Sequence, residues 1–85
     1  MKVFEFLIQS EEGIHARPAT VITNLCKQFT STIKITNKET TVDGRRMIAV
    51  MSLNAKKGDS LRVTIEGEDE QQAYDALLKT FKETL

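Results

Sequence analysis

The residues with the clearest chemical potential lie in the run Gly13-Ile14-His15-Ala16-Arg17-Pro18-Ala19, which contains the only histidine of the chain. Proline is tolerated in the first turn of a helix, because the amides there have no intrahelical acceptor, so Pro18 predicts a helix start within a residue or two. His15 then lies just outside that helix, where free N–H groups and the positive end of the helix dipole converge, and Arg17 adds a fixed cation. An anion carried on the imidazole would be stabilised there. The pattern indicates reversible phosphoryl chemistry on His15, supported by a helix start that includes Ala16 and Pro18.

The same residues could also have ordinary structural roles without any chemistry. A lone histidine is more often an ordinary surface or core residue, and an arginine in a first helical turn is commonly a surface side chain. Gly13, which supplies a free backbone turn, and the neighbouring Arg17 and Pro18 favour a functional His15. The spacing alone leaves both interpretations open. The preceding Glu11 and Glu12 are interpreted as solvated turn residues, although inward-turned side chains would act on the imidazole.

Composition narrows the function classes. Eighty-five residues make one small domain, 1–85. Twelve basic and twelve acidic residues cancel, and with five aromatic residues (four Phe and one Tyr) the usual footprint of a nucleic-acid-binding protein is absent. The lone Cys26 excludes an internal disulfide and a cysteine-based metal cluster, and it suits a reducing cytosol. No apolar run approaches membrane-spanning length, and we expect neither a signal peptide nor direct membrane insertion.

Hydrophobic periodicity predicts the elements of the first half of the chain. Alternation predicts a strand over residues 2–8, with Phe4, Phe6 and Ile8 on one face. A polar turn follows, and then a helix over 16–29. Two β-branched segments, 32–36 and 40–42, are separated by a short polar break and predict a hairpin. The helix would bury a stripe of Ala19, Ile22, Cys26 and Phe29.

In the second half, the segment 45–53 is too apolar for a plain loop and is interpreted as a short helix. Residues 60–66 alternate again and predict a strand, and Asp69 with Gln72 resembles a capping box that begins a last helix. The hairpins and the missing βα repeat indicate an α+β fold with an antiparallel sheet and helices on one face. The strand order stays open. The stripe expected to be buried in the last helix comprises Ala73, Ala76, Leu77, Thr80 and Phe81.

Beyond the histidine motif, the segments Val50-Met51-Ser52-Leu53 and Gly67-Glu68-Asp69-Glu70 stand at matching distances along the chain. With residues 13–20 they resemble HPr, the histidine-containing phosphocarrier of the bacterial phosphoenolpyruvate-dependent sugar phosphotransferase system (PTS). The resemblance covers essentially all 85 residues. It implies an HPr-like open-faced β-sandwich of order βαββαβα, with a four-stranded antiparallel sheet, three helices on one face and the first strand beside the fourth. His15 would then lie at one end of the molecule, near the short helix.

The resemblance also implies a function. His15 would accept a phosphoryl group on Nδ1 from phospho-Enzyme I and donate it to sugar-specific acceptor (EIIA) proteins, with Arg17 stabilising the transferred group. Such a protein would be a carrier and not an enzyme, and we expect a cytoplasmic monomer without cofactor or metal. Transcriptional regulators are further candidate partners. By spacing, Val50 and Leu53 face the core. The expected docking surface consists of Thr20, Met47, Ile48 and Met51, of which the last three are expected to be partly exposed; the competing interpretation is that these three only fill the core.

One departure from the family pattern affects regulation. Position 46, where HPr proteins generally carry a serine that is phosphorylated in many Gram-positive bacteria, is Arg46 here, and the hydroxyl acceptor is missing. Ser52 is a weak substitute because it lies on the far turn of the short helix. Asn54 replaces a usual glycine and is expected to keep a left-handed helix end. The alternative function is an HPr-like regulatory paralogue that signals to non-transport partners through the phosphorylation state of His15, and in either case the serine regulatory site is lacking.

Overall fold

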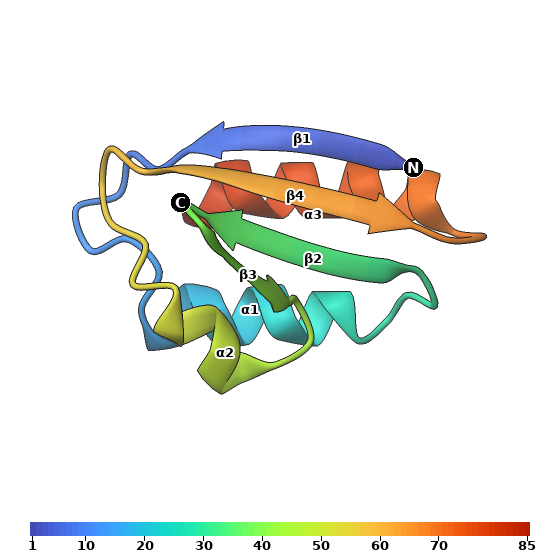
Figure 1. Cartoon of the computed structure of the whole chain (residues 1–85), viewed down its shortest axis with the longest axis horizontal. Coiled ribbons are helices and arrows are strands. Elements are labelled where there is room, and N and C mark those ends of the chain that lie inside the picture. Colours follow the sequence, from blue (N-terminus) through green and yellow to red (C-terminus); the bar gives the residue numbers. More distant parts are fainter.

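The computed structural model describes all 85 residues as a four-stranded sheet with three helices (Figure 1). The chain forms seven elements in the order strand, helix, strand, strand, helix, strand, helix. No helix is both long and apolar enough to cross a membrane. The elements are β1 (Lys2–Leu7), α1 (Ala16–Cys26), β2 (Thr32–Asn37), β3 (Thr40–Asp43), α2 (Met47–Ser52), β4 (Ser60–Glu66) and α3 (Glu70–Thr84).

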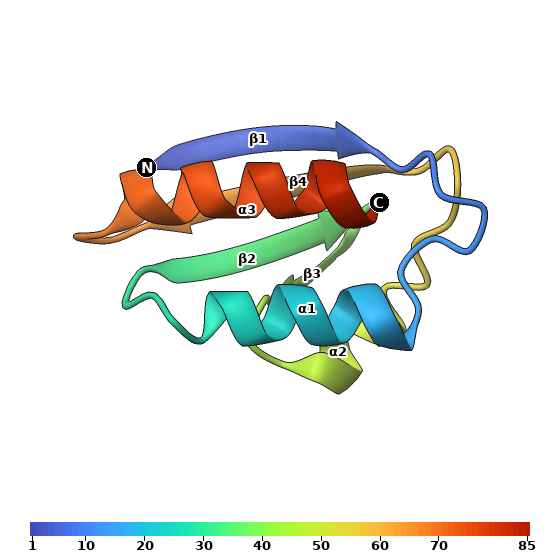
Figure 2. The same ribbon diagram turned by 180° about the vertical axis from the view of Figure 1, so that it is seen from behind.

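The sheet has the strand order β1-β4-β2-β3, and every neighbouring pair is antiparallel. Val63 of β4 lies opposite Phe4 of β1 on one side and opposite Ile35 of β2 on the other. Helices α1 and α3 cover one face, and α2 lies beside α1 near β3 (Figures 1 and 2). The predicted open-faced fold is confirmed, including the first strand beside the fourth.

The core fills the space between this sheet and the helices. Phe81 of α3 meets Phe4 and Phe6 edge to face, with ring centroids 5.4 and 5.7 Å apart, and Phe4 also meets Tyr74 at 5.6 Å. Cys26 is fully buried, and burial is the main cause that raises the pKa of its thiol to about 12. The cysteine therefore packs in the core, as its helical spacing predicts.

Helix α1 ends at Cys26 and not at Phe29, so the predicted helix was too long. The reason is a competing acceptor from the other end of the chain. The carboxylate of Asp69 accepts the N–H groups of Thr30 and Ser31, both at 2.9 Å, which holds these amides outside the helix. Phe29 still packs against the core, but from the turn that follows α1.

The predicted capping box of Asp69 and Gln72 was wrong for the same reason. The Asp69 side chain makes no cap hydrogen bond to α3, because its oxygens are taken by Thr30 and Ser31. The hydrogen bonds from the Ser31 hydroxyl and from the Thr30 amide hold the pKa of Asp69 below its usual value. The start of α3 is stabilised instead by Glu70, whose Oε1 accepts the N–H of Gly67 at 3.1 Å.

The remaining differences concern element ends. Helix α2 starts at Met47 and not at residue 45, because Asp43 accepts the preceding amides in a turn: Arg45 N–H binds its Oδ1 at 2.9 Å and Arg46 N–H binds its carbonyl at 3.1 Å. Strand β1 ends at Leu7, although residue 8 stays buried. In the predicted stripe of α3, Ala73, Leu77 and Phe81 are buried, whereas Ala76 and Thr80 are only half-buried.

Candidate functional site

His15 occupies the N-cap position of α1. Its backbone is extended (φ −115°, ψ −165°), and its carbonyl accepts the N–H of Ala19 at 3.0 Å, which closes the first helical turn. The amides of Ala16 and Arg17 therefore have no intrahelical acceptor, and the buried Pro18 has no N–H. The predicted helix start is confirmed. The imidazole makes no capping hydrogen bond, its side chain is 41% exposed, and it lies at the positive end of the helix dipole.

The loop before His15 is held on the segment that follows α2. Gly13 has φ +62°, and a Cβ at this position would collide with the carbonyl oxygen of Ala55, so both the backbone conformation and the close approach require glycine. Its N–H donates to the carbonyl of Ser10 at 3.1 Å, and the next amide, that of the buried Ile14, donates to Ala55 at 3.0 Å. These contacts fix the direction in which the chain enters α1.

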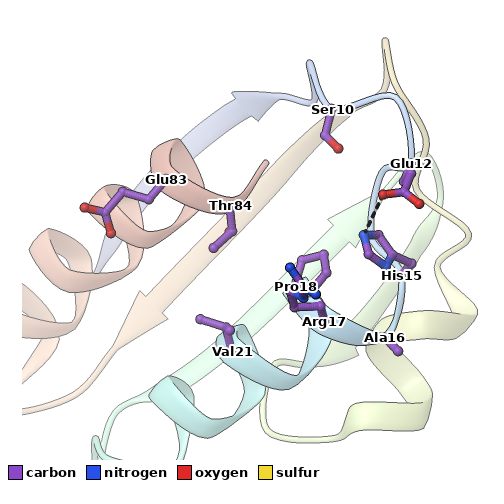
Figure 3. A pocket seen from close by; sticks show the side chains of 9 residues that line it. All are labelled: Ser10, Glu12, His15, Ala16, Arg17, Pro18, Val21, Glu83 and Thr84. Carbon is purple, nitrogen blue, oxygen red and sulfur yellow. Dashed lines mark ion pairs between the residues drawn. The ribbon is translucent and has the colours of Figure 1, made fainter.

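The same loop is also held by the end of α3. The N–H groups of Gln9 and Ser10 donate to the backbone oxygen of Leu85 at 3.1 and 2.9 Å. As a result, an open cavity of about 610 Å³ forms between the loop, the first turn of α1 and the last turn of α3 (Figure 3). Sequence reasoning missed Glu83 and Thr84 on the far side of this cavity, and no local signal marks them, because only tertiary packing brings the end of α3 to His15.

One charged side chain contacts the imidazole, and another lines the same cavity. Oε1 of Glu12 lies 3.5 Å from Nε2 of His15, so Glu12 is more than the plain solvated residue of the first interpretation, although its side chain is 76% exposed (Figure 3). Glu11 does face away and pairs with Lys57 at 2.7 Å. Arg17 is exposed, lines the cavity with His15 and takes part in no ion pair. An unpaired guanidinium and an accessible imidazole thus line the same cavity.

The four expected docking residues lie where α1 and α2 meet. The Thr20 hydroxyl donates to the carbonyl of Ala16 at 2.8 Å and contacts the sulfur of Met47 at 3.5 Å. Met47 and Met51 are half-buried against the core, whereas Ile48 is 78% exposed. The structure therefore brings the four together, with Ile48 as the most exposed apolar side chain of the group.

The other residues of α2 follow the predicted pattern. Val50 and Leu53 are buried, and Asn54 has φ +52°, so the left-handed helix end persists without glycine. Arg46 is the exposed N-cap residue of α2, while the Ser52 hydroxyl, on the last turn, donates to the carbonyl of Ala49 at 2.6 Å. No group of three or more His, Cys, Asp or Glu side chains converges in a way that could hold a metal ion.

Comparison with known proteins identifies similar sequences and a matching family. The family model for the "PTS HPr component phosphorylation site" matches residues 2–83. Over 76 residues the chain is 45% identical to a multiphosphoryl transfer protein of Salmonella typhimurium; the match covers 86% of this chain but only 20% of that protein, so the chain spans about a fifth of that relative's length. It is also 36% identical to the phosphocarrier protein HPr of Lysinibacillus sphaericus, with 91% of this chain and 88% of that one covered.

The solved structures agree. The histidine-containing phosphocarrier protein of Mycoplasma superposes with a TM-score of 0.95 at 30% identity, with 98% of this chain and 94% of that chain covered. A similarity of this extent includes the sheet, all three helices and the loop that leads into α1. The chain therefore belongs to the HPr family of PTS phosphocarrier proteins.

Proposed function

We propose that this chain accepts a phosphoryl group on Nδ1 of His15 from phospho-Enzyme I and donates it to sugar-specific EIIA proteins. The observation that carries the proposal is that the accessible imidazole of His15 and the unpaired guanidinium of Arg17 line one cavity at the N-terminus of α1. The lone pair of Nδ1 forms a bond to phosphorus while the bond from phosphorus to the donor breaks, and that electron pair leaves with the donor. Donation to the acceptor reverses these changes.

The phosphoryl oxygens need positive partners during the transfer. Arg17 offers two parallel N–H donors and a charge that no carboxylate of the protein neutralises, and the free amides of Ala16 and Arg17 add the helix terminus. In such transfers the protein contributes mainly position and electrostatics, so the chain acts as a carrier that turns over only with its partners.

Docking of the partners is assigned to the surface formed by Thr20, Met47, Ile48 and Met51. An apolar surface with two flexible methionines beside the reactive histidine suits a protein that meets several partners in turn. The multiphosphoryl transfer relative supports a role in a phosphoryl relay, because it carries a domain of this kind within a longer chain. Such a relay, with its phosphoenolpyruvate-charged Enzyme I, is expected in the cytoplasm.

Phosphorylation with Enzyme I and phosphoenolpyruvate tests the proposal. Intact-mass measurement under alkaline conditions is expected to show one added phosphoryl group, which acid treatment removes, because phosphohistidine is labile to acid and survives base. The variant His15→Ala is expected to remain unlabelled. Labelling of this variant to the level of the parent protein would refute His15 as the acceptor.

The regulatory alternative uses the same histidine and differs in the partner that reads its phosphorylation state. In either case the exposed Arg46 at the N-cap of α2 offers no hydroxyl, so control through a phosphoserine at this position is absent. Transfer from the phosphorylated protein to purified EIIA proteins separates the two. Stoichiometric transfer supports the carrier, whereas a protein that accepts phosphate but passes it to no EIIA supports the regulator.

A further inference from the structure

The only charged side chain paired with the imidazole of His15 is that of Glu12. Its Oε1 lies 3.5 Å from Nε2, and Glu12 makes no other ion pair (Figure 3). Glu11, the adjacent carboxylate, is engaged elsewhere by Lys57. The chain thus offers two neighbouring glutamates, of which one faces the reactive ring and the other does not.

We propose that Glu12 is a positioning residue that sets the tautomer of His15, an inference that rests on the proposed function of that histidine. A neutral imidazole carries one proton, on either Nδ1 or Nε2, and only the nitrogen without the proton has a free lone pair. A carboxylate accepts hydrogen bonds and cannot donate them when ionised, so Glu12 favours the form with the proton on Nε2. That form leaves the lone pair on Nδ1, the atom assigned to attack phosphorus.

Glu12 also complements the charge that develops during transfer. When Nδ1 bonds to phosphorus while Nε2 keeps its proton, the ring gains a positive charge, and this charge lies close to the Glu12 carboxylate. When the phosphoryl group leaves for an acceptor, the electron pair of the N–P bond returns to Nδ1 and the ring becomes neutral again. A buried carboxylate plays the corresponding part toward the histidine of a Ser-His-Asp triad, by holding the tautomer and stabilising the imidazolium.

In the phosphorylated protein, a negative side chain would therefore face the imidazole ring and a positive side chain would face the phosphoryl group. Glu12 faces the ring, whereas Arg17 lines the cavity into which the phosphoryl group would project. Glu83, from the end of α3, lines the same cavity and pairs with neither residue. Because the Glu12 side chain is 76% exposed, water screens its charge, and removing it is expected to slow transfer only roughly two- to fivefold.

The test compares Glu12→Ala with the matched control Glu11→Ala. The ¹⁵N spectrum of the histidine ring, recorded at about pH 9 where an ordinary imidazole is neutral, reports the tautomer directly. We expect the proton on Nε2 in the parent protein and in Glu11→Ala, and a shift toward the spectrum of a histidine in an unstructured peptide in Glu12→Ala. Because unfolding alone would give the same peptide-like spectrum, a thermal melt at this pH has to show that Glu12→Ala is folded.

The second measurement is the rate of phosphorylation of His15 by phosphoramidate, a small donor that needs no partner protein. Glu12→Ala is expected to be slower than Glu11→Ala by the factor given above. Identical ring spectra and rates in the two variants would overturn the role of Glu12. A parent protein that takes no phosphoryl group from phosphoramidate or from Enzyme I would instead overturn the proposed function of His15, and the ring spectra would still decide whether Glu12 sets the tautomer.

Discussion

Replacing Ile48 with Glu is expected to weaken binding to Enzyme I while leaving the fold intact. Complete burial of an isoleucine side chain is worth about 1.5 to 3 kcal/mol. Ile48 is 78% exposed, so roughly 1 to 2 kcal/mol of this remains to be gained when a partner covers it. Loss of that contribution corresponds to a Kd about 5- to 30-fold higher, and a charge in a desolvated interface adds to the loss. The free energy of unfolding is expected to change by less than about 0.5 kcal/mol.

The matched control is Leu7→Glu. Leu7 is also an exposed apolar residue, at 52%, but it lies on β1, on the side opposite to the core-facing Phe6. Titration calorimetry with purified Enzyme I measures the two Kd values, and thermal unfolding measures the two stabilities. Ile48 is a sharper probe than Met51, because Met51 is packed against the core and its replacement would also destabilise the protein. Equal Kd values for the two variants would refute the assignment of the docking surface.

Three further substitutions address charge. Arg17→Ala is expected to slow phosphoryl transfer roughly tenfold or more, about 1.4 kcal/mol of barrier, without a change in melting temperature; wild-type rates in a folded variant would contradict its role. An ATP-dependent HPr serine kinase is expected to leave the parent protein unmodified at position 46, whereas Arg46→Ser creates an acceptor. The serine-phosphorylated variant should accept phosphate at His15 more slowly, because the added negative charge repels the incoming phosphoryl group. If mass spectrometry locates stoichiometric kinase-dependent phosphate on Ser52 of the parent protein, the regulatory site has moved to Ser52. For Asp69, the lowered pKa in the folded protein means that its stabilising effect is present above the unfolded value of about 3.9 and is lost as the pH falls through the folded value. Asp69→Asn should therefore melt lower than the parent at neutral pH and lose less stability between about pH 5 and pH 2, and equal acid dependence of the two melting temperatures would argue against this account.

Local patterns predicted the elements well where the determining residues are close in sequence. Strand β4, residues Ser60–Glu66, matches its predicted bounds, because strict alternation and a preceding turn define it. Pro18 correctly predicted the start of α1, and Gly13 predicted a turn at a position where the observed backbone requires glycine. The candidate histidine site was predicted from local features as well, since the residues used for that prediction lie within a few positions of His15.

The errors arose where distant residues compete. The end of α1 and the capping of α3 both depend on Asp69, which binds the amides of Thr30 and Ser31 across the fold. Nothing in the sequence near residue 30 reveals such an acceptor. Likewise, which of the two glutamates before Gly13 would face His15 depends on the loop geometry, and that geometry is imposed by Ala55, which follows α2.

The strand order has a consequence for how the protein is made. The central strand β4 comes late in the chain, yet both β1 and β2 pair with it, so a nascent chain that has reached only residue 59 lacks the middle of its sheet. The loop before His15 can form its hydrogen bonds only later, because their acceptors are Ala55 and Leu85, which are synthesised after it. Such non-local pairing slows folding, since the entropy of closing long loops is lost before the contacts form. Nearly the whole domain must therefore leave the ribosome before the loop that leads into His15 can take its folded conformation.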